Sequence, residues 1–254
     1  MQINYLNFIY YGNEIAPADW KWCCHPYNYC NRLYYINSGD ASYIDKDGAH
    51  KFLKGHIYFL PRSTNYRLVQ DQNNRLDHLY FDFICIPIPC GTDVVALNTD
   101  NDEIISGFIQ TLKQFVNKAP YYSKESAPYR RYITLTLTML LEYLHTKYAL
   151  PFLFDSTLQD SIIYMLEHFS EPISVNEIAR RAGYNPKYFI RLFTDAMQIT
   201  PYQFLRNMRI NRALSLIKEG SSISQAAIAV GFQHASSLSN AIHARQQNAG
   251  RSEE

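Results

Sequence analysis

A short segment near residue 190 places cationic, polar and apolar side chains along one side of an expected helix. The members of this stripe fall at positions i, i+3, i+4 and i+7, and they are Lys187, Ile190, Arg191 and Thr194. Lys and Arg donate hydrogen bonds to the guanine edge in the major groove of DNA, and an apolar side chain can meet a thymine methyl group. Phe189 and Phe193 lie on the opposite side. We therefore predict that the stripe contacts bases, with an ordinary hydrated helix surface as the alternative.

A second stripe with the same layout lies further along the chain. It consists of Ser236, Ser239, Asn240 and His243. Asn can bind adenine through two hydrogen bonds, and Ser contacts bases or phosphates. Phosphate contacts supply affinity and salt dependence rather than sequence specificity. The candidates for them are Arg180, Arg181, Arg206 and Arg245.

Both stripes belong to an internal repeat. Residues 174–184 (SVNEIARRAGY) align with residues 222–232 (SISQAAIAVGF) at an offset of 48. Each copy begins with a Ser followed three residues later by Glu or Gln, which is a helix-starting capping box, and ends at a Gly suited to a left-handed backbone. A second helix follows each Gly, so the repeat predicts helix-turn-helix units at about 174–197 and 222–246. A longer helix from Thr200-Pro201 to Lys218 is expected to hold the two units in fixed relation.

Positive charge is concentrated in the same region. The whole chain has a formal net charge of +1, but residues 172–251 hold ten Lys and Arg against three acidic residues, a net +7. This imbalance is typical of a polyanion-binding module, with solvated helix faces as the alternative.

The first hundred residues alternate short β-rich runs with Gly and Asp turns, which is typical of an antiparallel sandwich or barrel. The runs are RLYYIN, ASYID, HIYFLP and LDHLYFDFICI. Two helices are expected next, at 102–118 and 129–148. The second helix has an extra apolar stripe of Leu135, Met139 and Tyr143, so the helix at 129–149 is expected either to form a homodimer or to pack within the chain.

The repeat region resembles the AraC/XylS family of bacterial transcription regulators from Leu158 to Ala244. The stretches that carry the resemblance are ISVNEIARRAGYNPKYFIRLFTDAM, TPYQFLRNMRINRALSLI and ISQAAIAVGF. The N-terminal half is similar to the family's sensor barrel through YYINSG, FLKGHIYFLP and LYFDF. The resemblance implies a two-domain α+β protein. Residues 1–155 would form a cupin-like antiparallel β-barrel with two trailing helices, and residues 156–254 an all-α DNA-binding domain.

The resemblance also implies partners and roles. The barrel would bind a small-molecule effector, often a sugar, the following helix would form a dimer, and the two units would bind adjacent major-groove segments of double-stranded DNA. RNA polymerase is a further partner if the protein is an activator. Lys187, Ile190 and Arg191 match base-reading positions of the first unit. The matching positions of the second unit are Ala235, Ser236, Ser239 and Asn240.

The chain departs from the family pattern at several positions. Ile242-His243 replaces a usual Phe-Lys pair, Asn240 stands where Arg is usual, and Gln198 stands where the first unit has Gly. The final segment ARQQNAGRSEE lacks the usual ending. The first unit is therefore expected to carry more of the DNA binding.

Aromatic residues of the N-terminal half are candidates for effector contacts because aromatic rings stack on sugar rings, although an aromatic core would look the same. The candidates are Trp20, Trp22, Tyr34, Tyr43 and Tyr80.

Metal and catalytic sites are not indicated by the remaining motifs. Cys23, Cys24, His25 and Cys30 lie close together but lack the paired spacing of zinc sites. The isolated histidines, read as core or surface residues, are His50, His56 and His78. Neither catalytic spacings nor cofactor motifs are present. Since the N-terminus does not read as a signal peptide and no apolar run is long enough to span a membrane, we expect a cytoplasmic protein with reduced thiols.

The sequence thus predicts a sequence-specific DNA-binding regulator, not an enzyme, controlled by an effector in the N-terminal barrel. Two alternatives stay open. One is a cupin-type metalloenzyme, and the other is a ligand-binding partner protein with weakened DNA binding.

Overall fold

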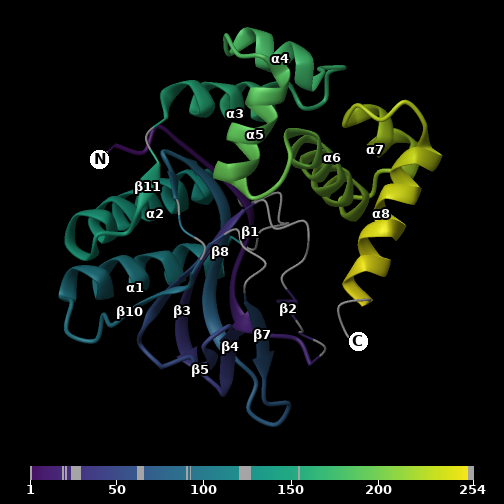
Figure 1. Ribbon diagram of the computed structural model, residues 1–254. Helices are drawn as coiled ribbons and strands as arrows, with labels where there is room; N and C mark the ends of the chain where they lie inside the picture. The colour runs from purple at the N-terminus through teal and green to yellow at the C-terminus, as the bar shows by residue number, and fades with distance from the viewer. Residues whose placement is uncertain are drawn as a thin grey trace. The chain divides into compact units, whose positions relative to one another are not determined.

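A computed structural model describes residues 2–18, 20, 22–23, 30–61, 66–89, 91, 93–119, 127–153 and 155–250, without the side chains of 22, 23, 127 and 245–250. The chain divides into two compact units after Leu153 (Figure 1). The first unit holds all the strands and helices α1 and α2, and the second holds helices α3 to α8. The predicted boundary at residue 155 lies close to this division.

The described strands of the first unit form two main antiparallel sheets. The five-stranded sheet has the order β1 (Tyr5–Ile15), β8 (Asp77–Ile86), β3 (Asn31–Ser38), β6 (Ile57–Leu60) and β10 (Val95–Leu97). The four-stranded sheet has the order β2 (Trp22–Cys23), β7 (Arg67–Gln70), β4 (Ala41–Asp45) and β5 (Gly48–Lys51). A short pair consists of β9 (Ile88–Pro89) and β11 (Phe152–Leu153). The antiparallel architecture is confirmed, but these strands form separate sheets where a closed barrel was expected.

The five-stranded sheet is covered on both faces. Side chains alternate along a strand, so Leu33 and Phe81 point to one face while Tyr34 and Tyr80 point to the other. The first face packs against helices α1 (Glu103–Lys118) and α2 (Ala127–Tyr148) in one apolar core. The second face forms an aromatic core with residues of the four-stranded sheet, such as Tyr43. A central strand such as β8 is therefore buried on both sides, which explains its nearly continuous apolar run.

Helix α2 has two apolar faces, of which one is buried and the other is largely exposed. One face is fully buried against the sheet and α1, and it comprises Ile133, Leu137, Leu140, Leu141 and Leu144. On the other face Leu135 and Met139 are 54% and 58% exposed. The third predicted member of that stripe, Tyr143, is half-buried and donates a hydrogen bond to Asp102.

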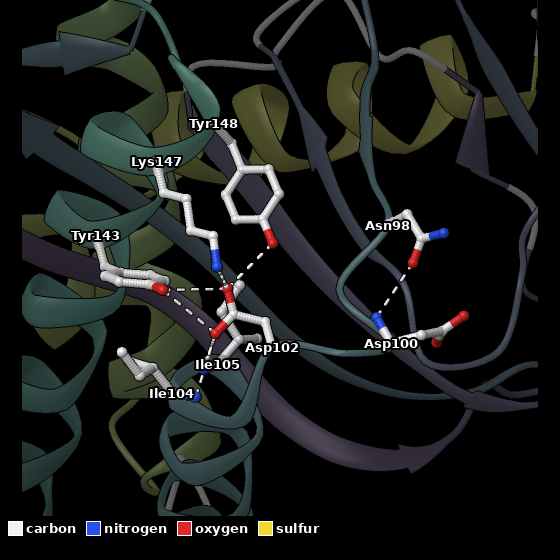
Figure 2. A network of polar contacts seen from close by, with 8 residues as sticks. All are labelled: Asn98, Asp100, Asp102, Ile104, Ile105, Tyr143, Lys147 and Tyr148. Carbon is white, nitrogen blue, oxygen red and sulfur yellow. Dashed lines mark hydrogen bonds and ion pairs between the residues drawn. The ribbon is translucent and has the colours of Figure 1, made fainter.

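Asp102 joins α1 to α2 (Figure 2). Its carboxylate accepts hydrogen bonds from the backbone N–H groups of Ile104 and Ile105 and so caps α1. From α2, the Lys147 ammonium lies 2.6 Å from the same carboxylate, and the Tyr148 hydroxyl donates to it at 3.1 Å. Although desolvation acts to raise it, these donors, with Lys147 the strongest, lower the pKa of Asp102 to about 2.

The described elements of the second unit are all helices. Its elements are α3 (Ser156–His168), α4 (Val175–Arg181), α5 (Pro186–Met197), α6 (Pro201–Lys218), α7 (Ile223–Ala229) and α8 (Ala235–Gly250). Helix α6 lies between the α4–α5 pair and the α7–α8 pair (Figure 1). The helices of the described chain include none with the length and apolar content needed to cross a membrane.

Candidate nucleic-acid interface and ligand pocket

The first helix pair is fixed by its caps and its turn. Ser174 Oγ accepts a hydrogen bond from the Glu177 N–H at the start of α4. Gly183 takes φ +73 in the turn, a conformation that strains residues with a Cβ. The Asn185 side chain then accepts from the Lys187 N–H, and Pro186 occupies the first turn of α5. These local signals set where α5 begins and therefore which side chains it exposes.

The inward face of α5 is aromatic. Phe189 and Phe193 have no exposed surface, and the Phe193 ring lies 5.5 Å from Phe204 of α6. Burying side chains of this size stabilises a helix pair by about 1.5–3 kcal/mol each. This packing fixes the rotation of α5 about its axis.

The outward face of α5 carries the predicted stripe. Lys187, Ile190 and Arg191 are exposed, while Thr194 is partly buried and its hydroxyl donates a 2.6 Å hydrogen bond to the Ile190 carbonyl oxygen. The Arg191 guanidinium lies 5.4 Å from the centre of the Tyr188 ring, which is itself 44% exposed. Tyr188 was not predicted, and its place one turn before Arg191 is the signal that could have revealed it.

The second helix pair follows the same plan with a smaller core. Ser222 and Gln225 form the predicted reciprocal capping box of α7. Gly231 takes φ +82, and a Cβ there would lie 2.4 Å from the Ser170 carbonyl oxygen, so only Gly fits this turn. The core that this pair shares with α6 consists of Ala213, Ala226, Ala227, Val230 and Leu238. These side chains bury less apolar surface than the Phe side chains of the first pair.

The outward face of α8 is polar, and its described side chains include no Lys, Arg, Asp or Glu. Ser236, Asn240 and His243 are exposed, while Ala235 and Ser239 are partly buried. Nδ1 of His243 lies 2.8 Å from the Ser239 carbonyl oxygen. The predicted members of the second stripe thus come from one helix, and Asn240 is exposed on it.

The arginines near the stripes fall into different environments. Arg180 is exposed, and Arg206 is partly buried on α6. The Arg181 guanidinium lies 4.4 Å from the centre of the Tyr164 ring of α3. The Arg245 side chain lies outside the described residues. Arg209 of α6 donates to two backbone carbonyl oxygens after α3 and is therefore structural.

The first unit contains a cavity of about 250 Å³ over the five-stranded sheet. Its aromatic lining comes from Tyr10, Trp20, Tyr34 and Tyr80, and its polar lining from Glu14, His78 and Asp82. The strand register explains this gathering, because Tyr10 and Arg32 pair with Asp82, Gly12 and Tyr34 pair with Tyr80, and Glu14 and Ile36 pair with His78. Three adjacent strands therefore present one face to the cavity.

Three of the predicted effector residues, Trp20, Tyr34 and Tyr80, line this cavity. Tyr43 does not line it and stacks on His50 at 4.7 Å, and the Trp22 side chain lies outside the described residues. Sequence reasoning missed the contributions of Tyr10, Glu14 and Asp82 and took His78 for an ordinary core or surface residue. The polar residues at alternate positions of the buried run LDHLYFDF were the available signal. Among the described residues, no group of three or more His, Cys, Asp or Glu is placed to hold a metal ion. The side chains of Cys23 and Cys24 are not among the described residues.

Comparison with known proteins agrees with this geometry. A family model described as a helix-turn-helix domain matches residues 178–247, which span both helix pairs. The Bacillus subtilis HTH-type transcriptional regulator YbfI is 29% identical over 75 residues, covering 30% of this chain and 27% of that protein. The Escherichia coli melibiose operon regulatory protein is 28% identical over 74 residues, covering 29% of this chain and 24% of that protein. The match thus spans about a quarter of the length of these curated relatives.

The fold similarity extends over nearly the whole chain. ToxT from Vibrio cholerae has a TM-score of 0.59 and 15% identity, covering 95% of this chain and 93% of ToxT. A ToxT structure bound to an unsaturated fatty acid has a TM-score of 0.56 and 14% identity, covering 95% of this chain and 91% of that one. Residues 178–247 are thus similar to the helix-turn-helix domains of transcription regulators, and the chain as a whole has a fold similar to that of ToxT. The chain combines an antiparallel sheet unit with two helix-turn-helix units.

Proposed function

We propose that this protein is a sequence-specific DNA-binding transcription regulator of the AraC/XylS family. The observation that carries the proposal is the exposed stripe of Lys187, Ile190 and Arg191 on the second helix of a helix-turn-helix, held outward by a fully buried aromatic face. Second helices of such pairs enter the major groove, where Arg and Lys recognise guanine. The polar face of α8 supplies a second contact, and a net +7 over residues 172–251 supplies phosphate affinity.

The proposal assigns effector binding to the cavity of the first unit. A cavity of this size suits a small metabolite, and aromatic walls with a few polar groups are typical of ligand sites. The fatty acid of the ToxT structure supports a ligand-responsive role for this fold. Ligand binding there would alter DNA affinity through a coupling free energy between the two sites.

The proposal also includes a homodimer formed through α2. Leu135 and Met139 expose more than half of their surface on a helix whose other face is fully buried. Burying this stripe against a second copy would remove apolar surface from water. Sedimentation of wild type and a Leu135→Glu, Met139→Glu variant tests this. A dimer that becomes a monomer is expected, and an unchanged molecular mass would exclude this face.

The test of DNA binding is fluorescence anisotropy with a duplex from the region upstream of the protein's own gene. A duplex of the same composition in scrambled order is the control. We expect tighter binding to the upstream duplex, and an affinity that falls at least about tenfold between 50 and 200 mM salt. If neither duplex binds even at low salt, the proposed function is wrong.

A further inference from the structure

The walls of the cavity in the first unit form a partial aromatic cage. The Tyr34 and His78 ring centres lie 4.7 Å apart at an angle of 68°, and His78 stacks on Tyr80 at 4.8 Å. Tyr10 lies 5.7 Å from Tyr80 on one side, and Trp20 lies 6.2 Å from His78 on the other. These contacts place four aromatic side chains and His78 side by side in the lining of one cavity. Such cages bind cationic groups because the face of each ring is electron-rich.

The charges that line the cavity sum to a negative value. The Arg32 guanidinium is 2% exposed and is paired with Asp82 at 3.1 Å, so these two charges cancel. Burial lowers the pKa of His78 to about 3, which keeps its ring neutral near pH 7. Glu14 remains, accepts a 2.8 Å hydrogen bond from the Tyr80 hydroxyl, and forms an ion pair with no Lys or Arg of the described chain.

We propose that the effector of this protein is a small organic cation, an amine or quaternary ammonium compound held by the aromatic cage and the Glu14 carboxylate. The inference rests on the proposed effector-binding role of the first unit. An anionic ligand would find the Arg32 guanidinium already paired with Asp82 and would face the Glu14 carboxylate. A cation gains both a Coulomb attraction to the exposed Glu14 side chain and contact with the aromatic rings.

Gly12 supports the same arrangement. It sits between Tyr10 and Glu14 on β1 and pairs with Tyr80, and a Cβ there would lie 2.6 Å from the Tyr80 hydroxyl oxygen. The absence of a side chain lets the Tyr80 ring cross over β1 and reach Glu14. The cage and its carboxylate are therefore joined by a contact that only Gly at this position permits without displacement.

The test is direct binding of matched probes to the full chain without DNA, measured by calorimetry. Trp fluorescence is a second readout because the chain has only two Trp, at positions 20 and 22. The probes are choline, its uncharged isostere in which a tert-butyl group replaces the trimethylammonium, butyrate as an anion and glucose as a neutral sugar. We expect choline to bind at least about tenfold more tightly than its isostere.

Two variants test whether choline binds in the cavity. Glu14→Gln keeps the hydrogen bond from Tyr80 but removes the charge, and it should lower choline affinity about fivefold or more. Glu103→Gln, an exposed substitution on α1 of the same unit, should leave it unchanged. Equal binding of choline and its isostere, preferred binding of glucose or butyrate, or no binding of any probe would overturn the proposal. DNA affinity is measured separately. A failure of the choline prediction therefore leaves the proposed regulator function intact, whereas absence of DNA binding by the wild-type protein would contradict that function.

Discussion

The Nε of Arg209 donates a 2.6 Å hydrogen bond to the carbonyl oxygen of Phe169, just after the end of α3. A second nitrogen of the same guanidinium donates to the Glu171 carbonyl oxygen at 2.8 Å. Arg209 therefore ties α6 to the segment that follows α3, where the carbonyl groups of a helix end lack intrahelical partners. Cations of the second unit thus divide into some that hold the fold and others, such as Arg191, that are exposed at the surface.

Replacing Arg209 should lower the stability of the second unit. Arg209→Ala leaves two carbonyl groups without their charged donor, so we expect the free energy of unfolding in urea to fall by about 2 kcal/mol. Arg212→Ala is the matched control, because that side chain is exposed and lies 3.8 Å from Glu219. The control should change stability by less than about 0.5 kcal/mol. Equal stability of the two variants would show that the Arg209 contacts do not support the fold.

The Asp102 carboxylate should make the free energy of unfolding depend on pH in the acidic range. Its pKa of about 2 in the folded protein lies below the ordinary value near 4, so the unfolded chain binds the proton more readily. The stabilisation is therefore complete above about pH 4 and is lost as the pH falls toward 2. Asp102→Asn keeps an acceptor for the α1 cap but removes the charge.

We expect Asp102→Asn to be about 1–2 kcal/mol less stable than wild type at pH 7, less than the whole pKa shift implies because Lys147 is half exposed. Denaturant unfolding at pH 7, 4 and 3 should show the difference shrinking as the pH falls. Asp100→Asn, at an exposed site two residues away (Figure 2), is the control. A difference that persists unchanged at the lowest pH would exclude the charge as its source.

Gln198 ends α5 in a left-handed conformation, with φ +57. A Cβ in this region costs about 1 kcal/mol, partly offset here by a 2.8 Å hydrogen bond from the Gln198 side chain to the Asp195 carbonyl oxygen. Gln198→Gly should therefore raise the free energy of unfolding by up to about 1 kcal/mol. Asp195→Gly, inside the helix, should lower it. A loss of stability in Gln198→Gly would mean that the side-chain bond outweighs the backbone strain.

The helical repeat could be predicted because its signals are local. Capping residues such as Ser222, turn glycines such as Gly231 and the alternation of Phe189 with Lys187 all act within a few residues. The helices and both outward stripes followed from them. At Gln198 the sequence showed only a departure from the usual Gly, and the left-handed backbone there was not predicted.

The ligand cavity could not be predicted because it depends on strand register. Glu14, Tyr34 and His78 lie far apart in sequence and meet only because β1 and β3 both pair with β8. Strand β1 was not predicted from the sequence, so Glu14 could not be assigned to the cavity. For the same reason a barrel was expected where the described strands form separate sheets, since sequence alternation does not say which strands are hydrogen-bonded.

The two helix pairs should contribute unequally to DNA binding. Asn240 carries no charge and belongs to the pair with the smaller core, so Asn240→Ala should weaken binding to the upstream duplex less than Arg191→Ala does. Because Asn240 neutralises no phosphate, the slope of affinity against salt should stay as in wild type. Anisotropy at several salt concentrations measures both quantities. A larger loss in Asn240→Ala would make α8 the dominant reading helix.

The most direct test of the regulator function is the affinity of Arg191→Ala for the upstream duplex at physiological salt. Removal of a base-reading Arg is expected to cost about 1–3 kcal/mol, a roughly 5- to 150-fold loss of affinity, while the melting temperature stays close to that of wild type. Arg212→Ala, another exposed Arg of the same unit, should bind nearly as wild type. If Arg191→Ala keeps wild-type affinity and specificity, α5 does not read DNA and the account of the stripe is contradicted.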